Sequence, residues 1–494
     1  MPRFALHQHG KIRPIDDASR GGHNKATCMN EKITLCNSGQ PALDARALRD
    51  AAVKLDCADR LLHQQLETGG EDMPDAFRTV PCDPIDQSVN VCAIYDPSCG
   101  SWRFQELWSL MFGYSSGVMN FNRWSKFLEG ACRRVAGLMW TMYYDDGSLR
   151  DLACAKGEGQ LLARSLFSLI GAPLSDSKRQ QLGSQAVFLG LVHDVAGALC
   201  VPGSISFWPR EGLVKSLDSR ISEMLSTGTC SSSESNKLVG VLNFTATGMW
   251  GKVGRVALSA LRARARCKRR SPRMDADTVD ALEFFLVLLD LHPHRLAPTS
   301  PPTRRPVIAA TDAQADRQPS GGYLLYDKDA NIKTGGFFEF TQKFLNLVGY
   351  PKERLQEGGN PIAICEAAAV LVMLLEEQQA LRGKDVIVFV DNTSALQAYV
   401  KGGSGNEYIA RTIQVWHLCA YLLQFAVWFE FVPSGQNWAD GISRNGIKDA
   451  WALSHCFRTK LLDVPAWPWM GSLHKCSSHF PPLWTGGSGG DPSP

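Results

Sequence analysis

The sequence predicts an α+β and α/β protein of two or three domains, on three observations. The chain has 494 residues, which is too long for one ordinary hydrophobic core. Its middle part, residues 203–292, carries apolar residues at helical spacing, as in the stretch "VGRVALSALRARA". After residue 305, strand-like runs alternate with helical runs, a pattern typical of a mixed sheet covered by helices.

The composition is that of a soluble globular protein. Hydrophobic residues make up 44% of the chain and charged residues 20%. No apolar run reaches the roughly 18 residues that a membrane span needs, and the start shows no signal-peptide pattern. We therefore expect an intracellular protein of the cytoplasm or nucleus that is not secreted and has no membrane partner.

Cysteine usage and net charge argue against two other classes. The fifteen cysteines are scattered and form no C-x-x-C pair, which argues against a disulfide framework and against a zinc knuckle. The 52 Lys and Arg residues and 49 Asp and Glu residues give a formal charge of only +3. The charge of the whole chain therefore does not indicate nucleic acid as a partner.

One local basic run stands out against this balance. The stretch "LRARARCKRRSPR" contains no acidic residue. Its basic residues are Arg262, Arg264, Arg266, Lys268, Arg269, Arg270 and Arg273. By itself such a run is either a solvated helix end or a surface that contacts phosphates.

Prolines divide the chain near residue 300. The stretch "HPHRLAPTSPPTRRPV" predicts a linker without regular structure over residues 293–305. The α/β part after it is expected to contain, in order, "PVIAATDAQA", the hairpin "GGYLLYD" with "TGGFFEF", the helix "AICEAAAVLVMLLEEQQAL", the strand "DVIVFVD", the helix "RTIQVWHLCAYLLQF" and the strand "VWFEFVP". Residues 447–494 are expected to form a tail that ends in a disordered segment.

A first group of carboxylates centres on the stretch "MWTMYYDDGSLRD". An aromatic run followed by Asp-Asp-Gly-Ser predicts a strand, a turn and a second strand. A turn does not explain why Asp145 and Asp146 stand side by side, because their like charges repel. Asp72, just ahead of a strand-like run further upstream, could share a cation with them. Mg²⁺ prefers such oxygen ligands, and two ions can serve phosphoryl transfer.

A second group of carboxylates follows the expected linker. Asp312 and Asp391 stand where strands end, Glu366 stands where a helix opens, and Asp440 stands near the start of another helix. Each of them alone could be a cap or a turn residue. Together they can converge at one edge of the sheet and hold two metal ions for the hydrolysis of a phosphodiester.

The first half of the chain resembles a reverse transcriptase in six segments that follow that family's order. The stretch "RFALHQHGKIRPIDDASRGGHN" resembles the fingers segment, "DMPDAFRTVP" the first catalytic motif, "LMFGYSSGVMNFNRW" the glycine-containing segment and "YYDD" the third motif. The stretch "LIGAPLSDSKRQ" resembles the lysine motif and "AVFLGLVHD" the primer-grip hairpin. The second half resembles the ribonuclease H fused to retroelement polymerases, through its order Asp, Glu, Asp and then Ala-Asp-x-x-Ser-Arg.

This resemblance implies two metal centres, each with two Mg²⁺ or Mn²⁺ ions. In the polymerase the ligands would be Asp72, Asp145 and Asp146. In the nuclease they would be Asp312, Glu366, Asp391 and Asp440.

The resemblance also implies contacts to substrate. Lys11 and Arg13 would contact the incoming nucleotide, Phe77 would exclude a 2′-hydroxyl, and Gly113 would allow a close backbone approach to template or nucleotide. Lys178 would neutralise or protonate the leaving pyrophosphate. The contacts to the template–primer backbone would come from Arg262, Arg264, Arg266, Lys268, Arg269 and Arg270.

Over residues 3–446 the resemblance implies a retrotransposon RNA-directed DNA polymerase with ribonuclease H activity. Its partners would be an RNA template, a DNA primer, the RNA–DNA hybrid, dNTPs and other products of the retroelement polyprotein. The right-hand polymerase would have its fingers and palm in residues 1–200 and a helical thumb or connection in 201–292. The linker 293–305, a ribonuclease H-like α/β domain in 306–446 and the C-terminal tail 447–494 would follow.

An alternative reading stays open beside this one. Family members have further fingers strands and a helix ahead of the position of Lys11, so we expect an N-terminally truncated fingers region. The stretch "LMFGYSS" lacks the Pro-Gln-Gly of many relatives, and His417 lies in an apolar helical stretch typical of a core. The alternative is an inactive or domesticated retroelement-derived protein that binds nucleic acid.

Overall fold

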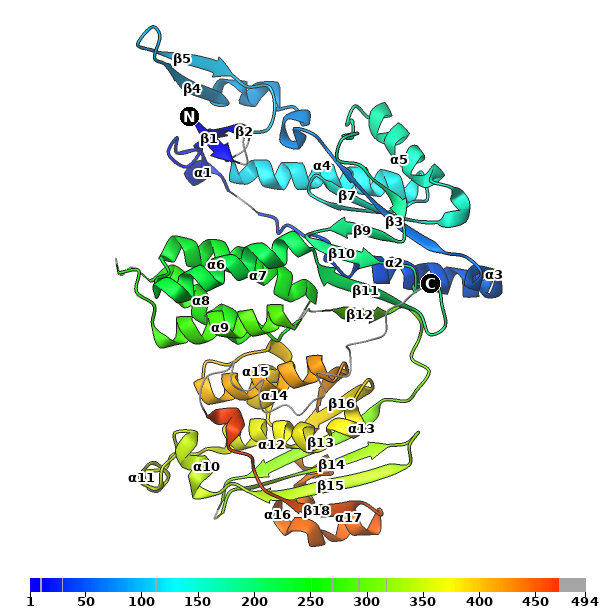
Figure 1. Cartoon of the computed structure of the whole chain (residues 1–494), viewed down its shortest axis with the longest axis vertical. Coiled ribbons are helices and arrows are strands. Elements are labelled where there is room, and N and C mark those ends of the chain that lie inside the picture. Colours follow the sequence, from blue (N-terminus) through cyan, green and yellow to red (C-terminus); the bar gives the residue numbers. More distant parts are fainter. Residues whose placement is uncertain are drawn as a thin grey trace. The chain divides into compact units, whose positions relative to one another are not determined.

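The described part of the chain forms two compact units. The computed structural model describes residues 1–8, 11–28, 30–111, 113–249, 251–267, 271–291, 294–316 and 318–470. The N-terminal unit comprises Met1–Arg210 with His294–Pro301, and the C-terminal unit comprises Glu211–Pro293 with Pro302–Pro494. Both units contain helices and the chain forms several sheets (Figure 1), so the expected mixed α/β protein with more than one domain is confirmed.

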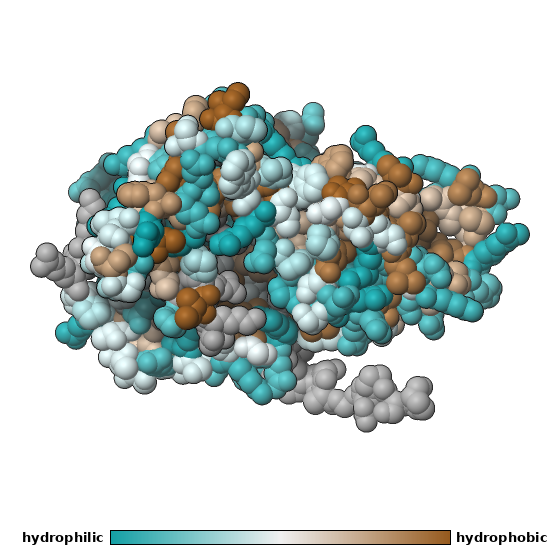
Figure 2. Space-filling model, turned by 90° about the horizontal axis from the view of Figure 1, so that it is seen from above, coloured by the Kyte–Doolittle hydropathy of each residue, from teal (hydrophilic) through white to brown (hydrophobic). Residues whose placement is uncertain are grey.

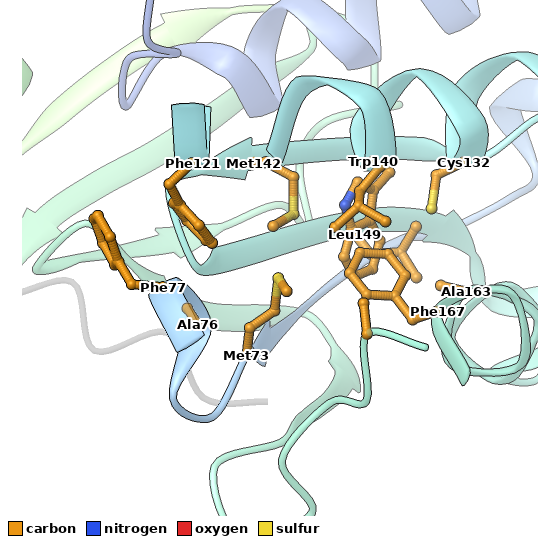
Figure 3. Packing of buried hydrophobic residues seen from close by; sticks show 12 residues of the cluster. Met73, Ala76, Phe77, Phe121, Cys132, Trp140, Met142, Leu149, Ala163 and Phe167 are labelled. Atoms are coloured by element: carbon orange, nitrogen blue, oxygen red, sulfur yellow. The ribbon is translucent and has the colours of Figure 1, made fainter. Parts of the chain in front are cut away.

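The N-terminal unit is built around a four-stranded sheet with the strand order β6-β7-β3-β8. Its strands are β3 (Leu66–Asp72), β6 (Met139–Tyr143), β7 (Asp146–Leu152) and β8 (Gln180–Gly183). Helices α4 (Ser115–Arg134) and α5 (Glu158–Leu169) supply apolar side chains to the same core as this sheet, as Figure 3 shows. The core includes Trp140 from β6, Phe121 from α4 and Phe167 from α5.

The hairpin of β6 and β7 turns two residues earlier than its glycine and serine predict. Tyr143 pairs with Asp146, so Tyr144 and Asp145 form the turn, and Tyr144 has a φ of +52°. Gly147 lies within β7, where a Cβ atom would come 2.4 Å from the ring of Trp140. The glycine is therefore required by packing against the tryptophan rather than by the turn.

Smaller elements surround this core in the N-terminal unit. A second four-stranded sheet has the order β12-β11-β10-β9, and two hairpins pair β1 with β2 and β4 with β5. The strands are β1 (Arg3–Gln8), β2 (Lys11–Asp16), β4 (Val91–Asp96), β5 (Ser101–Glu106), β9 (Gln185–Phe188), β10 (Leu191–Asp194), β11 (Ser204–Pro209) and β12 (Arg295–Pro298). The other helices are α1 (His23–Ala26), α2 (Gln40–Lys54) and α3 (Ala58–Leu62), with 3₁₀ turns at Ala76–Thr79, Pro84–Val89 and Ala153–Ala155.

The prediction of an unstructured linker over residues 293–305 is wrong at its centre. Residues Arg295–Pro298 form strand β12, which pairs antiparallel with β11. Strand β12 lies at the edge of its sheet, where a terminal proline is tolerated because one side of the strand donates no ladder hydrogen bonds. Proline content alone could not reveal an edge strand here.

A buried ion pair joins helix α2 to the first sheet. Asp44 on α2 accepts a hydrogen bond from the guanidinium of Arg150 on β7, and both side chains are buried. Arg150 also donates to Thr141 Oγ1 at 2.6 Å and to Ser148 Oγ at 2.8 Å. The pair fixes α2 against the strand that begins with Asp146.

The first part of the C-terminal unit is helical, as its periodicity predicts. The helices, which follow one another along the chain in Figure 1, are α6 (Glu211–Thr227), α7 (Ser232–Met249), α8 (Arg255–Arg266) and α9 (Ala276–Asp290). Helix α9 begins at an N-cap, Asp275, whose side chain accepts a hydrogen bond from Thr278 N. Apolar residues of α6 to α9 such as Leu261 and Phe285 are fully buried.

The second part of the C-terminal unit is a six-stranded mixed sheet with the order β17-β16-β13-β14-β15-β18. The strands are β13 (Val307–Gln314), β14 (Ser320–Asp327), β15 (Ile332–Glu339), β16 (Asp385–Val390), β17 (Ala426–Phe431) and β18 (Arg458–Leu462). Strands β13, β14 and β15 pair antiparallel, whereas β16 and β17 continue the sheet in parallel to β13. The mixed sheet and five of these strands follow the predicted pattern.

Helices cover both faces of this sheet, as Figure 1 shows. One face carries α12 (Ile362–Glu376), with α14 (Thr393–Lys401) and α15 (Glu407–Leu422), and the other carries α16 (Asp440–Asn445), with α17 (Ala450–Ser454). The remaining helices are α10 (Gln342–Leu347), α11 (Lys352–Gln356) and α13 (Gln378–Leu381), and 3₁₀ turns lie at Ser434–Gln436, Gly446–Lys448 and Trp467–Trp469. The long helix expected from residue 363 to 381 is divided between α12 and α13.

The prediction of a tail from residue 447 onward is wrong for the described residues up to 470. Strand β18 (Arg458–Leu462) pairs in parallel with β15 and forms an edge of the sheet. Its sequence "RTKLL" is short and carries two basic residues, so it has no clear strand pattern. The expected disorder of "TGGSGGDPSP" falls outside the described residues.

On the face seen in Figure 2, apolar residues stand in small groups between polar ones. None of the helices in the described ranges combines the length and the apolar character that are needed to cross a bilayer.

The buried ion pair yields a stability prediction. Replacement of Asp44 by Ala leaves the charge of Arg150 buried without its partner, so we expect the free energy of unfolding to fall by about 3–5 kcal/mol. Urea denaturation of the full chain would measure this change. Asp50→Ala, on the exposed side of the same helix, is the matched control and should change stability by less than about 0.5 kcal/mol. Equal effects of the two variants would contradict the prediction.

Candidate functional site

Three aspartates meet at one end of the N-terminal unit's sheet, and we name them the first acidic site: Asp72, Asp145 and Asp146. Asp72 ends β3 and lies directly opposite Asp146 in the register of β3 with β7. Asp145 is in the adjoining turn, where its carbonyl oxygen accepts a hydrogen bond from Met73 N at 3.1 Å. The strand thus precedes Asp72 rather than following it as the sequence pattern indicated. The two glycines inside the run "LETGGED" obscured this strand.

Burial and mutual repulsion act on the first acidic site. Burial raises the pKa of Asp146 to about 6, and the charges of Asp145 and Asp72 add to the rise. Burial also raises the pKa of Asp145, with a further contribution from Asp72. The aspartates therefore lie close enough for each charge to oppose the next. Their oxygens are not among the described groups of three possible ligands that all lie within 4.8 Å of one another.

Lys178 provides the positive partner of this site. Its Nζ atom lies 2.8 Å from Oδ1 and 2.7 Å from Oδ2 of Asp72, so it bridges both oxygens of one carboxylate. The lysine is 63% exposed and the aspartate 13% exposed, which places the contact at the mouth of the site. Lys178 was predicted to act at the leaving pyrophosphate, but here it binds the carboxylate that was predicted to hold a metal ion.

The residues predicted to contact the nucleotide lie in different settings within the N-terminal unit. Phe77, in the turn after Asp72, is buried and stacks on Phe121 with ring centroids 4.7 Å apart, as Figure 3 shows. Gly113 has a φ of +104°, and a Cβ there would come 2.1 Å from the backbone oxygen of Asp16. The close approach that requires this glycine is therefore made to its own chain. The side chains of Lys11 and Arg13 lie outside the described residues.

A second group of acids lies in the C-terminal unit, and we name Asp312, Glu366, Asp391 and Asp440 the second acidic site. Asp312 stands near the end of β13, Asp391 directly follows the neighbouring parallel strand β16, and Glu366 stands in the second turn of α12. Ligand oxygens of these three all lie within 4.8 Å of one another. The parallel pairing of β13 with β16 brings the two aspartates to the same edge of the sheet.

Asp440 stands apart from this triad. It begins α16 and binds Arg444 one turn later, with Arg444 Nε donating to its Oδ1 at 2.9 Å. Its charge still contributes to the raised pKa of Asp312. The fourth predicted acid therefore lies at the rim of the site, and its side chain does not cap α16 in this structure.

Two polar residues that the sequence analysis did not single out hold the acids in place. Ser443 Oγ donates to Asp312 Oδ2 and lies 2.9 Å from the carbonyl oxygen of Asp440. Asn437 Nδ2 donates to the carbonyl oxygen of Thr311 at 2.9 Å, next to Asp312. The signal for Ser443 was its position three residues after Asp440, which places it one turn away on the same helix face.

Burial and mutual repulsion disfavour ionisation of the carboxyl groups in this triad. Burial raises the pKa of Glu366 to about 10, and the charges of Asp312 and Asp391 add to the rise. Burial also raises the pKa of Asp312 to about 7, with contributions from Asp391 and Asp440, although the hydrogen bond from Ser443 opposes it. Strongly shifted pKa values gathered in one cluster are typical of functional sites.

The triad fits a divalent metal ion. Glu366 Oε2 and Asp391 Oδ1 are buried and have no hydrogen-bond partner within the described part of the chain. Burying carboxylate oxygens without hydrogen-bond partners destabilises the fold unless a cation coordinates them. Oxygen-only donors are the ligands that Mg²⁺ and Mn²⁺ prefer. The first acidic site is less suited to a metal ion as it stands, because Lys178 Nζ already donates hydrogen bonds to the carboxylate of Asp72.

The basic run after residue 261 is only partly exposed. Arg264 is buried, and it donates to the carbonyl oxygens of Cys230 at 2.8 Å and Ser271 at 2.9 Å, so the prediction that it contacts a nucleic-acid backbone is wrong. Arg262 donates to Asn243 at the surface of α8, and Arg266 is exposed. The other predicted contacts, Lys268, Arg269 and Arg270, lie outside the described residues.

His417 has the core position that its apolar surroundings predict. It is buried in α15, and its Nε2 lies 3.1 Å from the carbonyl oxygen of Tyr399. Burial lowers its pKa to about 3, so it stays neutral.

Comparisons with known proteins give distant similarity to solved structures. No protein-family model and no curated protein matches the chain. Among solved structures, the chain is similar to a foamy viral protease-reverse transcriptase in complex with dsDNA. The TM-score is 0.41 and the sequence identity 14%, over 87% of this chain and 77% of that one.

The raised pKa values predict how stability depends on pH without metal. The folded state binds a proton at Asp312 more tightly than the unfolded state, so the stability this group contributes is present at low pH and is lost as the pH rises through about 7. Asp312→Asn removes the charge and should raise the free energy of unfolding at pH 8 by about 1–3 kcal/mol, with little effect at pH 4. Thermal unfolding in EDTA at both pH values would measure this. A destabilised variant at pH 8 would contradict it.

The contact of Lys178 with Asp72 predicts competition with metal. Lys178→Gln frees Asp72, so Mn²⁺ affinity at the first acidic site should rise by up to about fivefold, the value of an exposed ion pair. Mn²⁺ titration followed by electron paramagnetic resonance would measure it, in a background of Asp312→Asn with Asp391→Asn that weakens the second site. Lys54→Gln, on the exposed end of α2, is the control. Weaker binding by Lys178→Gln would show that the lysine helps to assemble the site.

Proposed function

We propose that this protein is an RNA-directed DNA polymerase of a retrotransposon that also carries ribonuclease H activity. The observation that carries the proposal is the largely buried triad of Asp312, Glu366 and Asp391, with two oxygens that lack partners among the residues the structure describes. A second, separate group of aspartates in the same chain supports it. Two acidic sites on two sheets are what a polymerase joined to a nuclease requires.

The structural elements support a revised division of the chain. The fingers and palm would lie in the N-terminal unit, and the thumb or connection would comprise helices α6 to α9. The ribonuclease H-like domain would extend from β13 to β18, because β18 belongs to its sheet. When bound, pairs of Mg²⁺ or Mn²⁺ ions would activate the attacking oxygen and stabilise the leaving oxygen of phosphoryl transfer.

In the polymerase, the chain's own residues would position the reacting groups. Asp72, Asp145 and Asp146 would hold the cations, with the β3–β7 register fixing the distance between Asp72 and Asp146. Phe77, held by its stacking on Phe121, would form a rigid wall beneath the sugar that excludes a 2′-hydroxyl. Lys178 would leave Asp72 when a cation binds there and be free to approach the leaving pyrophosphate.

In the nuclease, the acids would bind the cations and orient the phosphodiester of the RNA strand. Asp312, Glu366 and Asp391 would be the ligands, and Asp440 would join them from the rim after separating from Arg444. Ser443 would hold Asp312 in its rotamer. The protons that Glu366 and Asp312 retain at neutral pH would be released as the cations bind.

A second candidate function is nucleic-acid binding without catalysis by a decayed or domesticated retroelement copy. The bridge from Lys178 to both oxygens of Asp72 favours it, since the first acidic site is then satisfied without a metal ion. Salt-sensitive binding of an RNA–DNA hybrid without turnover would support this function. Turnover at either site would exclude it.

The two sites predict two separable activities. Asp145→Asn with Asp146→Asn should reduce Mg²⁺-dependent extension of a DNA primer on an RNA template by at least about 10³-fold, because both cation ligands lose their charge. It should leave cleavage of a preformed RNA–DNA hybrid intact. Asp391→Asn should do the reverse. Gel assays of extension and of hybrid cleavage on the same preparations would measure both. A single variant that abolishes both activities would contradict two independent sites.

A further inference from the structure

A charged network lies beside the first acidic site, on the other face of strand β3. Glu71 directly precedes Asp72, and because side chains alternate along a strand, the two carboxylates point to opposite faces of the sheet. The side chain of Glu71 is fully buried. Gln160 Nε2, from α5, donates to its Oε1 at 2.9 Å, and Arg164 Nη1, one turn further along α5, donates to its Oε2 at 2.6 Å. The carboxylate next to Asp72 is therefore tied to helix α5.

Arg164 joins this carboxylate to the loop that carries Lys178. Its Nη1 binds Glu71, while its Nη2 donates to the carboxylate of Asp176 and, at 3.4 Å, to the carbonyl oxygen of Leu174. A guanidinium has five N–H donors in a rigid plane, so it can bind all three acceptors at once. The side chain of Arg164 is only 18% exposed, so these contacts are largely shielded from solvent. The loop between α5 and β8 is therefore attached to strand β3 through one side chain.

Further contacts hold the same loop close to the first acidic site. Ser175 N donates to the carbonyl oxygen of Asp72 at 2.9 Å, so the backbone of the loop contacts the aspartate itself. Lys178 follows three residues later and binds both carboxylate oxygens of Asp72. Arg179 is the next residue, and its Nε lies 3.6 Å from Glu71 Oε1. Two successive basic residues therefore contact two successive acids of β3.

We propose that Arg164 is a positioning residue for Lys178. By holding Glu71 and Asp176 together, its guanidinium fixes the loop against β3 and keeps the lysine Nζ within reach of Asp72. A lysine side chain is long and flexible, so a fixed loop limits the space that its charged end samples. The role in catalysis rests on the proposed polymerase function, in which Lys178 approaches the leaving pyrophosphate. The network then sets how efficiently the lysine reaches that group.

A double-mutant cycle in the full chain tests this inference. Arg164→Gln should lower kcat for extension of a DNA primer on an RNA template by about tenfold, because the lysine is misplaced, and should leave the KM for dNTP within about twofold. In a Lys178→Gln background the same substitution should lower kcat by less than about twofold, because the side chain that Arg164 positions is already absent. An equal loss in both backgrounds would show that Arg164 only stabilises the fold and would overturn the inference.

A surface variant keeps the test independent of folding. Arg164→Gln leaves the charge of Glu71 buried with fewer partners, which can destabilise the unit. Asp176 is 92% exposed, so Asp176→Ala breaks the network at its loop end without burying a charge. It should lower kcat by up to about fivefold, the value of an exposed ion pair, and should have no such effect in the Lys178→Gln background. Asp59→Ala, which removes an exposed charge from α3, is the matched control and should behave as wild type.

Metal binding gives a readout that needs no turnover. If Arg164 holds the lysine at Asp72, both Arg164→Gln and Asp176→Ala should raise the Mn²⁺ affinity of the first acidic site by up to about fivefold, as Lys178→Gln is expected to do. Neither substitution should raise it further once Lys178 is replaced. Electron paramagnetic resonance, in the background that weakens the second acidic site, would measure these affinities.

The outcomes separate the inference from the proposed function. If the wild-type protein extends the primer, and both variants keep its kcat and its Mn²⁺ affinity, the inference is wrong and the polymerase assignment stands. If the wild-type protein extends no primer with Mg²⁺ or Mn²⁺, the proposed polymerase function is wrong and the catalytic part of the inference falls with it. The Mn²⁺ titration then decides by itself whether Arg164 positions Lys178.

Discussion

The mutual repulsion of carboxylates held close together is the constraint on which both acidic sites depend. Neither group of acids attracts its own members, so the force that gathers them must come from elsewhere. In the N-terminal unit it comes from the pairing of β3 with β7 and from the packing of Trp140 on Gly147. In the C-terminal unit it comes from the parallel pairing of β13 with β16. The apolar cores beneath the sites stabilise arrangements that the acids themselves oppose.

The two sites meet this constraint in different ways. The first site is open to the surface, and the positive charge beside its acids is the long, exposed side chain of Lys178. The second is buried and excludes such a side chain, so protons on Glu366 and Asp312 reduce the repulsion. If metal ions bind as proposed, the first site would give up the contact with Lys178 and the second would release protons. Asn437 and Ser443 show that the second also needs neutral polar residues to fix its geometry.

The sequence predicted most of the regular elements but not all of their functions. The spacing of apolar residues was sufficient to predict β13 to β17, α12 and α15. An element with one buried face places apolar residues at every second position in a strand and at every third or fourth in a helix. Strands β12 and β18 could not be predicted, since edge strands are short and tolerate proline and charge. Asp312, Glu366 and Asp391, which the sequence placed at strand ends and at a helix start, lie close together, and Asp72 lies opposite Asp146 in the other unit. The roles of these acids stay predictions. The burial of Arg264 and the contact of Lys178 with Asp72 depend on tertiary packing, which the local sequence pattern does not predict.

The pairing of β11 with β12 has a consequence for how this chain can change. Near the end of β11, residue 207 lies opposite residue 295, the first residue of β12, so the segment that contains α6 to α9 leaves the sheet and returns to it at adjacent points. A segment whose two ends are neighbours can be lengthened, shortened or exchanged without altering the sheet that carries it. The four helices are in this sense a cassette inserted into the N-terminal unit. Evolution could therefore vary them while the strands that position Asp72 and Asp146 stay fixed.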